Sequence, residues 1–171
     1  VGPIVLGGPA FFLWDRAKEI TDFYLQYVRH LPDELTTALY YWTTPPAPFL
    51  PESLHGQPVV IIAACYAGAA KAGEGVVAPI RALKPVADML GPLPYTGLQT
   101  MFDPLFPKGI YTYAKSDYFD VIPTAMVDDM IAWAAAHPKI LEQAAGRHLS
   151  LSLSALAAAI VLAFPLALVL V

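Results

Sequence analysis

About a third of the way along, the chain reads Pro58-Val-Val-Ile-Ile-Ala-Ala-Cys-Tyr66, a near-continuous apolar run. Such a run is typical of a strand that is buried on both faces, so we expect it at the centre of a sheet. The preceding segment, Thr36 to Thr44, is rich in β-branched and aromatic residues and predicts a second strand. Because side chains alternate along a strand, Tyr41 would lie on one face of it, and Tyr40 and Trp42 on the other.

The first 31 residues predict two extended pieces and a helix. Pro3 to Leu6 and Ala10 to Leu13 are separated by Gly7-Gly8-Pro9, which predicts a turn. Apolar residues then recur at helical spacing from Ala17 to Leu31. Asp15 is placed to cap this helix, since its carboxylate can accept hydrogen bonds from the first free amides.

Shorter elements follow the apolar run. Gly68 to Gly75 contains three glycines without the spacing of a phosphate-binding loop, and we expect a turn there. Val76 to Leu83 predicts a short helix with Pro79 in its first turn. Val86 to Leu90 predicts a strand, and Tyr95 to Phe102 a helical segment.

A further helix is predicted after Asp120, which would cap it. The apolar side that we expect it to bury comprises Ile122, Met126, Met130 and Trp133. Strands with intervening helices, but without repeated βαβ units, predict an α+β fold. We expect an antiparallel β-sheet with helices packed on one face, so the other face must meet solvent, a ligand or another domain.

The candidate binding site lies in Gly109-Ile-Tyr-Thr-Tyr-Ala-Lys-Ser116, within a strand predicted from Gly109 to Phe119. Tyr111, Tyr113 and Lys115 share one side of this strand because side chains alternate. Two phenols and an ammonium group make a poor core face and a suitable floor for a polar, aromatic ligand. The alternative is an edge strand with a solvated lysine and half-buried tyrosines.

The composition narrows the possible partners. The 171 residues suit one domain with a sizeable core, and 10 basic residues stand against 14 acidic ones without a basic cluster, so nucleic acid is not an expected partner. Cys65 is the only cysteine, which excludes an intramolecular disulfide and fits a reducing, cytoplasmic compartment. Its position in the apolar run is that of a small core residue. The four histidines lack paired ligand spacing, so no metal site is predicted.

Several short motifs occur in a particular order. Val1-Gly-Pro-Ile-Val-Leu-Gly-Gly8 precedes Asp15-Arg-Ala-Lys-Glu19 at the start of the first helix. The later motifs are Phe49-Leu-Pro51, His55-Gly56, Cys65-Tyr-Ala-Gly68, Gly73-Glu-Gly75, Pro94-Tyr95, Leu98-Gln99 and Tyr113-Ala-Lys-Ser116. From Val1 to about Pro138, their order and spacing resemble the substrate domain of berberine bridge enzyme-like FAD-linked oxidases, within the vanillyl-alcohol oxidase/PCMH flavoprotein superfamily.

This resemblance implies a fold and a role. In such oxidases an N-terminal domain holds FAD, usually through covalent bonds to His or to His and Cys, and the second domain lays an antiparallel sheet over the isoalloxazine ring. Hydride passes from the substrate to the flavin, and oxygen commonly reoxidises it. By this resemblance Tyr111, Tyr113 and Lys115 would form the substrate-side floor, and Tyr41 is a fourth candidate substrate-binding residue. The phenols could orient an alcohol or amine, and Lys115 could hold an anionic group or tune a nearby base.

The resemblance also departs from the family pattern in two places. The FAD domain with its attachment residues is missing, so no residue here inherits a cofactor-binding role, and FAD would come with a domain supplied in cis or in trans. The C-terminal part, which often supplies a catalytic Tyr, is missing too, so no catalytic residue is identified. We therefore expect a fragment that is inactive alone.

An apolar tail, Leu149 to Val171, follows the domain at residues 1–148 and has no ionisable side chain. Its length approaches the ~20 residues that cross a bilayer, and Lys139 and Arg147 before it would favour a cytoplasmic main domain. It could be an apolar C-terminal membrane helix, a helix hidden against a partner, or off-family sequence from a changed reading frame. The alternative function is therefore a non-catalytic, membrane-tethered binding or interaction module.

Overall fold

The computed structural model describes residues 2–46, 48, 50–101, 103, 119 and 121–137. Of the predicted strand from Gly109 to Phe119, Phe119 alone lies among them, and Asp120 and the apolar tail lie outside them. Within the described ranges, no helix combines the length and the apolar character needed to cross a bilayer.

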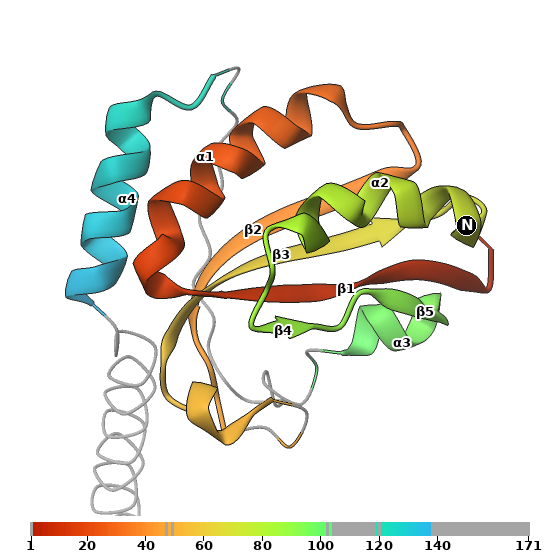
Figure 1. Ribbon diagram of the computed structural model, residues 1–171, viewed down its shortest axis with the longest axis horizontal. Helices are drawn as coiled ribbons and strands as arrows, with labels where there is room; N and C mark the ends of the chain where they lie inside the picture. The colour runs from red at the N-terminus through yellow and green to blue at the C-terminus, as the bar shows by residue number, and fades with distance from the viewer. Residues whose placement is uncertain are drawn as a thin grey trace, which may run out of the picture. The chain divides into compact units, whose positions relative to one another are not determined.

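The described residues form an antiparallel sheet of five strands, accompanied by helices (Figure 1). The sheet order is β2-β3-β1-β4, and β5 also pairs with β1. This arrangement confirms the predicted α+β class and its antiparallel sheet. The strands are β1 (Ile4–Leu13), β2 (Leu35–Thr43), β3 (Pro58–Tyr66), β4 (Ala87–Asp88) and β5 (Gly91–Pro94). The helices are α1 (Ala17–Tyr27), α2 (Ala70–Ala82), α3 (Tyr95–Thr100) and α4 (Thr124–Ala136), with 3-10 turns at Trp14–Arg16, Val28–His30 and Glu52–Leu54.

Strand β3 lies at the centre of the sheet, as its apolar sequence predicts. It pairs with β2 on one side and with β1 on the other, and Val59, Val60, Ile61 and Ile62 are buried. Alternate residues face two separate apolar clusters: Val60 and Ile62 join one, and Val59 and Ile61 join the other. The sheet is thus packed on both faces.

The two faces of the sheet are covered differently. Helices α1 and α2 lie on one face, to which they contribute Ala17, Ile20, Val77 and Ile80 (Figure 1). No helix of the described chain contributes to the buried cluster on the second face. The prediction that all helices pack on one face of the sheet does not hold for the short helix α3. Its Leu98 lies against Gly7 of β1, and Gly7 is directed to the second face.

The predicted turn at Gly7-Gly8-Pro9 is wrong, because β1 continues through these residues without interruption. Gly8 has a φ of +129°, and a Cβ atom added to it would overlap the carbonyl oxygen of Met89. The Met89 amide donates a hydrogen bond of 3.0 Å to the carbonyl of Pro9. The glycine therefore marks the close approach of a second backbone to the strand.

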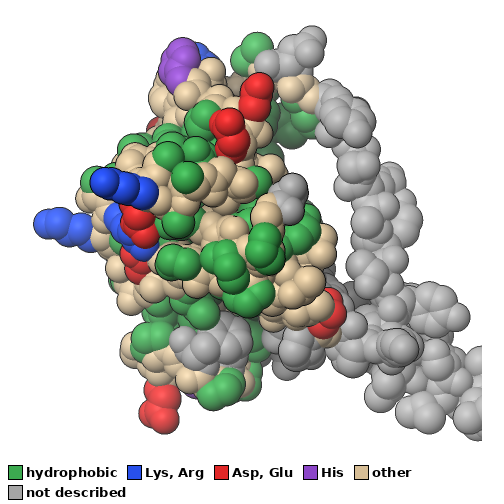
Figure 2. Space-filling model, turned by 90° about the vertical axis from the view of Figure 1, so that its right-hand side faces the viewer, with side chains coloured by type: hydrophobic (Ala, Val, Ile, Leu, Met, Phe, Trp, Pro, Cys, Tyr) green, Lys and Arg blue, Asp and Glu red, His purple; other side chains and the backbone are tan. Residues whose placement is uncertain are grey.

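The segment around Met89 is held by an arginine from α2. Arg81 Nε donates to Asp88 at 3.0 Å, and Arg81 Nη2 donates to the carbonyl of Leu90 at 2.6 Å. A third contact joins Arg81 to Glu74 on the preceding turns of the same helix. These contacts tie α2 to the segment that packs on Gly8. On the face of the molecule seen in Figure 2, basic and acidic side chains likewise lie close together among hydrophobic ones.

Two helix starts differ from the sequence-based expectation. Asp15 lies in a 3-10 turn, and neither that turn nor α1 has a side-chain cap, so the prediction that Asp15 caps the helix is wrong. Helix α2 begins at Ala70, which places Gly73 and Gly75 inside it and Pro79 beyond its first turn. Gly73 is needed there because an added Cβ would lie 2.6 Å from Cδ1 of Tyr66 on β3.

The predicted buried side of α4 is also wrong. Val127 is buried and Ile131 packs against the cluster shared by α1 and α2, whereas Met130 and Trp133 are exposed. Asp128 lies 3.6 Å from Lys18 of α1, which fixes the side that α4 turns toward that helix. Apolar residues occupy more than one side of α4, so the sequence pattern alone could not choose between the sides.

Candidate functional site

The structure places one of the four predicted site residues. Tyr111, Tyr113 and Lys115 lie outside the described residues, so the floor that they would form stays a prediction. Tyr41 lies on β2, and its ring is half-buried against the helix-covered face. Within the described residues, the candidate site therefore comprises Tyr41 and the second face of the sheet.

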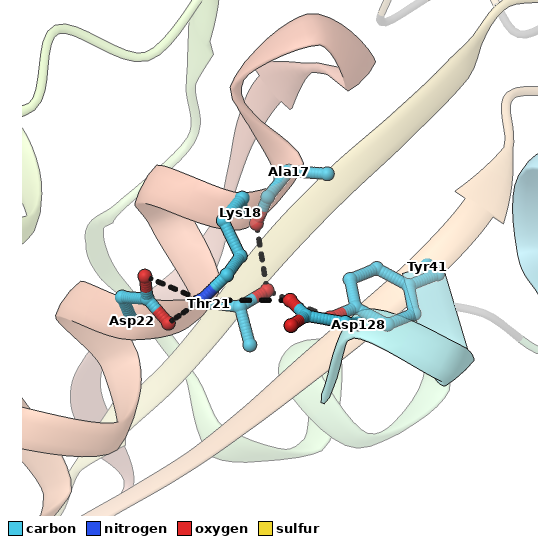
Figure 3. A network of polar contacts seen from close by, with 6 residues as sticks. All are labelled: Ala17, Lys18, Thr21, Asp22, Tyr41 and Asp128. Atoms are coloured by element: carbon cyan, nitrogen blue, oxygen red, sulfur yellow. Dashed lines mark hydrogen bonds and ion pairs between the residues drawn. The ribbon is translucent and has the colours of Figure 1, made fainter. Parts of the chain in front are cut away.

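The hydroxyl of Tyr41 is engaged by α1 (Figure 3). It lies 2.7 Å from Thr21 Oγ1, and Thr21 donates its own proton to the carbonyl of Ala17 at 2.7 Å. Because a hydroxyl carries one proton, Tyr41 is the donor to Thr21. The ring of Trp14 meets the Tyr41 ring edge-on at 5.5 Å. These contacts hold β2 against α1, so the described role of Tyr41 is structural.

Burial raises the pKa of the Tyr41 phenol, so it stays protonated at neutral pH. Lys18 Nζ, close by, lies 2.7 Å from Asp22 and 3.6 Å from Asp128, and the hydrogen bond to Asp22 raises its pKa (Figure 3). These three charged side chains are exposed, and exposed ion pairs contribute little to stability. The cluster connects α1, β2 and α4, and the raised pKa values of Tyr41 and Lys18 keep both groups protonated at neutral pH.

Replacing Tyr41 with phenylalanine should lower the free energy of unfolding by about 1 kcal/mol, the usual net value of one hydrogen bond. Thr21 keeps its bond to Ala17 in this variant, so no buried donor is left unpaired. Tyr40→Phe is the matched control, because Tyr40 is exposed on the other face of β2, and its effect should stay below ~0.5 kcal/mol. Urea unfolding of the full chain measures both. Equal effects would contradict the structural role of the Tyr41 hydroxyl.

The second face of the sheet is the better-defined candidate surface. It consists of the side chains of β1, β2 and β3 that point away from α1 and α2. Their register gives rows across the sheet, such as Tyr40–Ile61–Phe11 and Thr36–Cys65–Gly7. The face comprises Val5, Gly7, Pro9, Phe11, Leu13, Thr36, Ala38, Tyr40, Trp42, Val59, Ile61, Ala63 and Cys65.

The side chains of this face are large at one end of the strands and small toward the other. Phe11, Val59 and Ile61 are buried at one end, together with Leu50 from the connection that precedes β3. Ala38 and Ala63 form the next row toward the other end, where the side chains are small. Tyr40 is exposed beside the buried end. Such a face suits an aromatic, planar surface better than a charged one.

Tyr40 and Cys65 are the titratable side chains of β1–β3 on the second face. Cys65 is half-buried rather than part of the core, and the sequence did not indicate this, because the apolar run conceals which alternate residues are covered. Burial raises the pKa of the Cys65 thiol. The raised pKa keeps this thiol protonated at neutral pH, so we consider the face as a binding surface.

The raised pKa of Cys65 predicts slow alkylation at neutral pH, because the thiolate is the reactive form. We expect the rate with iodoacetamide to fall below that of a free cysteine peptide. It should also keep rising with pH beyond about 8.5, where the peptide has begun to level off. Unfolding the chain in urea should restore the peptide profile. Faster alkylation of the folded chain than of the peptide at neutral pH would contradict the burial argument.

No group of three or more histidine, cysteine, aspartate or glutamate side chains within the described ranges is arranged to hold a metal ion. The sequence matches no protein-family model, and no curated protein is detectably similar to it.

Proposed function

We propose that this chain is the substrate-binding part of an FAD-dependent oxidoreductase that oxidises an alcohol or an amine, and that it is inactive without an FAD-binding domain. The observation that carries the proposal is an antiparallel sheet with helices α1 and α2 on one face and an apolar, aromatic second face on which Tyr40 is exposed. When bound, the flavin would accept hydride from the substrate. FAD itself would be held mainly by the other domain.

The apolar and aromatic composition of the second face supports such a partner. Tyr40 and the small residues Ala38 and Ala63 would provide a flat surface toward the cofactor and substrate. Tyr111 and Tyr113 are proposed to orient the substrate, and Lys115 to hold an anionic group or tune a base. The described network around Tyr41 supports β2 from the opposite face.

The test is reconstitution with the FAD-binding domain of a berberine bridge enzyme-like oxidase. The mixture is screened without oxygen against sugars, alkaloids and phenolic compounds, and bleaching of the flavin absorbance is followed. Lys115→Ala should slow bleaching about tenfold, equivalent to about 1.4 kcal/mol. Lys71→Ala is the matched control, because Lys71 is exposed on α2, away from the second face.

The outcomes separate the parts of this proposal. Bleaching that requires the chain and is slowed by Lys115→Ala alone supports the site and the reaction. If bleaching requires the chain but its rate is equal in all variants, Lys115 is not part of the site. If the chain adds nothing to the FAD domain with any compound of the screen, the oxidoreductase proposal fails.

A second candidate function is a non-catalytic, membrane-tethered binding module. It is favoured by the tail from Leu149 to Val171, which has no ionisable side chain, and by the exposed apolar side of α4. This function predicts that the chain is retained in membrane fractions and released when residues 150–171 are removed. An unchanged distribution of the shortened chain would count against a membrane anchor.

A further inference from the structure

Helix α4 and the residues just before it carry an exposed apolar surface. Its members are Phe119, Val121, Ile122, Met130 and Trp133, each between 37% and 70% exposed. We call this surface the α4 patch. It is not part of the second face of the sheet, and neither the network around Tyr41 nor the proposed oxidation uses it.

The patch follows from the way the apolar residues of α4 are spaced. Val127 and Ile131 recur at an interval of four residues and pack toward α1. Met130 and Trp133 also share one side, because each residue turns the helix by roughly 100°, and Ile122 precedes the helix. The two sides are adjacent, so apolar residues cover about half of the helix circumference. A helix normally buries its apolar side, whereas on α4 Met130 and Trp133 are exposed.

We propose that the α4 patch rests on a lipid bilayer, in the zone between the headgroups and the acyl chains. The inference builds on the membrane-tethered function, in which Leu149 to Val171 enters the bilayer. Residues 138–148 join α4 to that segment and can span at most roughly 40 Å when fully extended. The tether would therefore keep the patch close to the lipid surface at a high effective concentration. Trp133 is a residue type that favours this zone.

The charge around the patch selects the type of lipid. Helix α4 contains Asp128 and Asp129 and has neither lysine nor arginine. Helices that bind anionic lipids carry basic residues on their polar side, so α4 lacks the attraction that such membranes need. Lys18 lies beside Asp128 and does not reverse this balance, and Lys139 and Arg147 belong to the connection that follows α4, not to the α4 patch. The patch should therefore prefer neutral, zwitterionic headgroups such as phosphatidylcholine.

The experiment uses the full chain reconstituted into phosphatidylcholine vesicles whose acyl chains are brominated close to the headgroup. Bromine quenches tryptophan emission on contact, and Trp133 is the exposed tryptophan of the patch. We expect quenching of the unmodified chain to be at least halved in Trp133→Phe. Trp42→Phe is the matched control, because Trp42 is half-buried on β2, and it should leave most of the quenching in place.

Vesicle flotation is measured in parallel, so that the tether and the patch can fail separately. A chain that does not float with the vesicles defeats the membrane-tethered function and the patch inference together. A chain that floats, but whose quenching is the same with and without Trp133, defeats the patch inference alone. Quenching that increases when phosphatidylglycerol is added overturns the preference for neutral lipid. A Trp133 emission shift that depends on protein concentration without lipid would assign the patch to a second copy and overturn the proposal.

Discussion

Replacing Gly8 with alanine is expected to lower the free energy of unfolding by roughly 3 kcal/mol or more. The backbone at Gly8 has a φ of +129°, which side-chain-bearing residues rarely adopt, and such strain costs about 1 to 3 kcal/mol. The added Cβ would also overlap the Met89 carbonyl oxygen and lie 2.9 Å from its carbonyl carbon. Relief would require moving a backbone segment that Arg81 and β1 hold in place. Overpacking of this kind adds about 1 to 3 kcal/mol.

Two other glycines provide controls that separate backbone strain from the overlap with Met89. Gly56 has a φ of +71° and open space around it, so Gly56→Ala should cost about 1 to 2 kcal/mol from backbone strain alone. Gly75 lies in α2 with open space and no positive φ, so Gly75→Ala should stabilise the protein by about 0.5 to 1 kcal/mol. Urea unfolding followed by circular dichroism gives the three values. If Gly8→Ala cost no more than Gly56→Ala, the close approach of Met89 would not matter for stability.

Replacing Phe12 with alanine should cost about 3 to 5 kcal/mol, the usual range for a large aromatic residue in a core. Phe12 is fully buried in the cluster that β1 and β3 share with α1 and α2, and the guanidinium of Arg16 lies 5.8 Å from its ring centre. A loss of this size is a large part of the ~5 to 15 kcal/mol that stabilises a typical domain.

Its neighbour in sequence is the control. Leu13 ends the same strand but points to the other side, with 40% of its surface exposed. Leu13→Ala should therefore cost below ~1 kcal/mol, because little buried surface is lost. Thermal or urea unfolding of both variants tests the pair. A smaller loss for Phe12→Ala than for Leu13→Ala would contradict the burial of Phe12 in this cluster.

Strongly patterned segments were predictable from the sequence. The apolar run from Pro58 to Tyr66 forms the central strand β3, and the alternation in the preceding strand correctly places Tyr41 opposite Tyr40 and Trp42. Both patterns indicate which faces of a strand are buried, because side chains alternate with a fixed two-residue period. The antiparallel sheet and the position of α1 follow from such local signals.

The errors arose where distant parts of the chain determine the local structure. Gly8 and Gly73 look like turn residues, yet each lets another element come close, namely the Met89 backbone and the Tyr66 ring. On α4, Val127 and Met130 are equally suitable for a core, and only packing against α1 selects Val127. For the site, the sequence could propose Tyr41 as a ligand residue but could not reveal that its hydroxyl is already bonded to Thr21.

The position of β1 inside the sheet has a consequence for how the chain folds. This strand comes first among the described strands, yet it pairs with β3, β4 and β5, all of which lie later in the chain. Because β1 is synthesised before these partner strands, its apolar residues stay unpaired until the partner strands have left the ribosome. Pairing between distant segments also slows folding, because a long loop must close before contacts form. We therefore expect the nascent chain to expose β1 to aggregation, and to depend on chaperones until β5 is available.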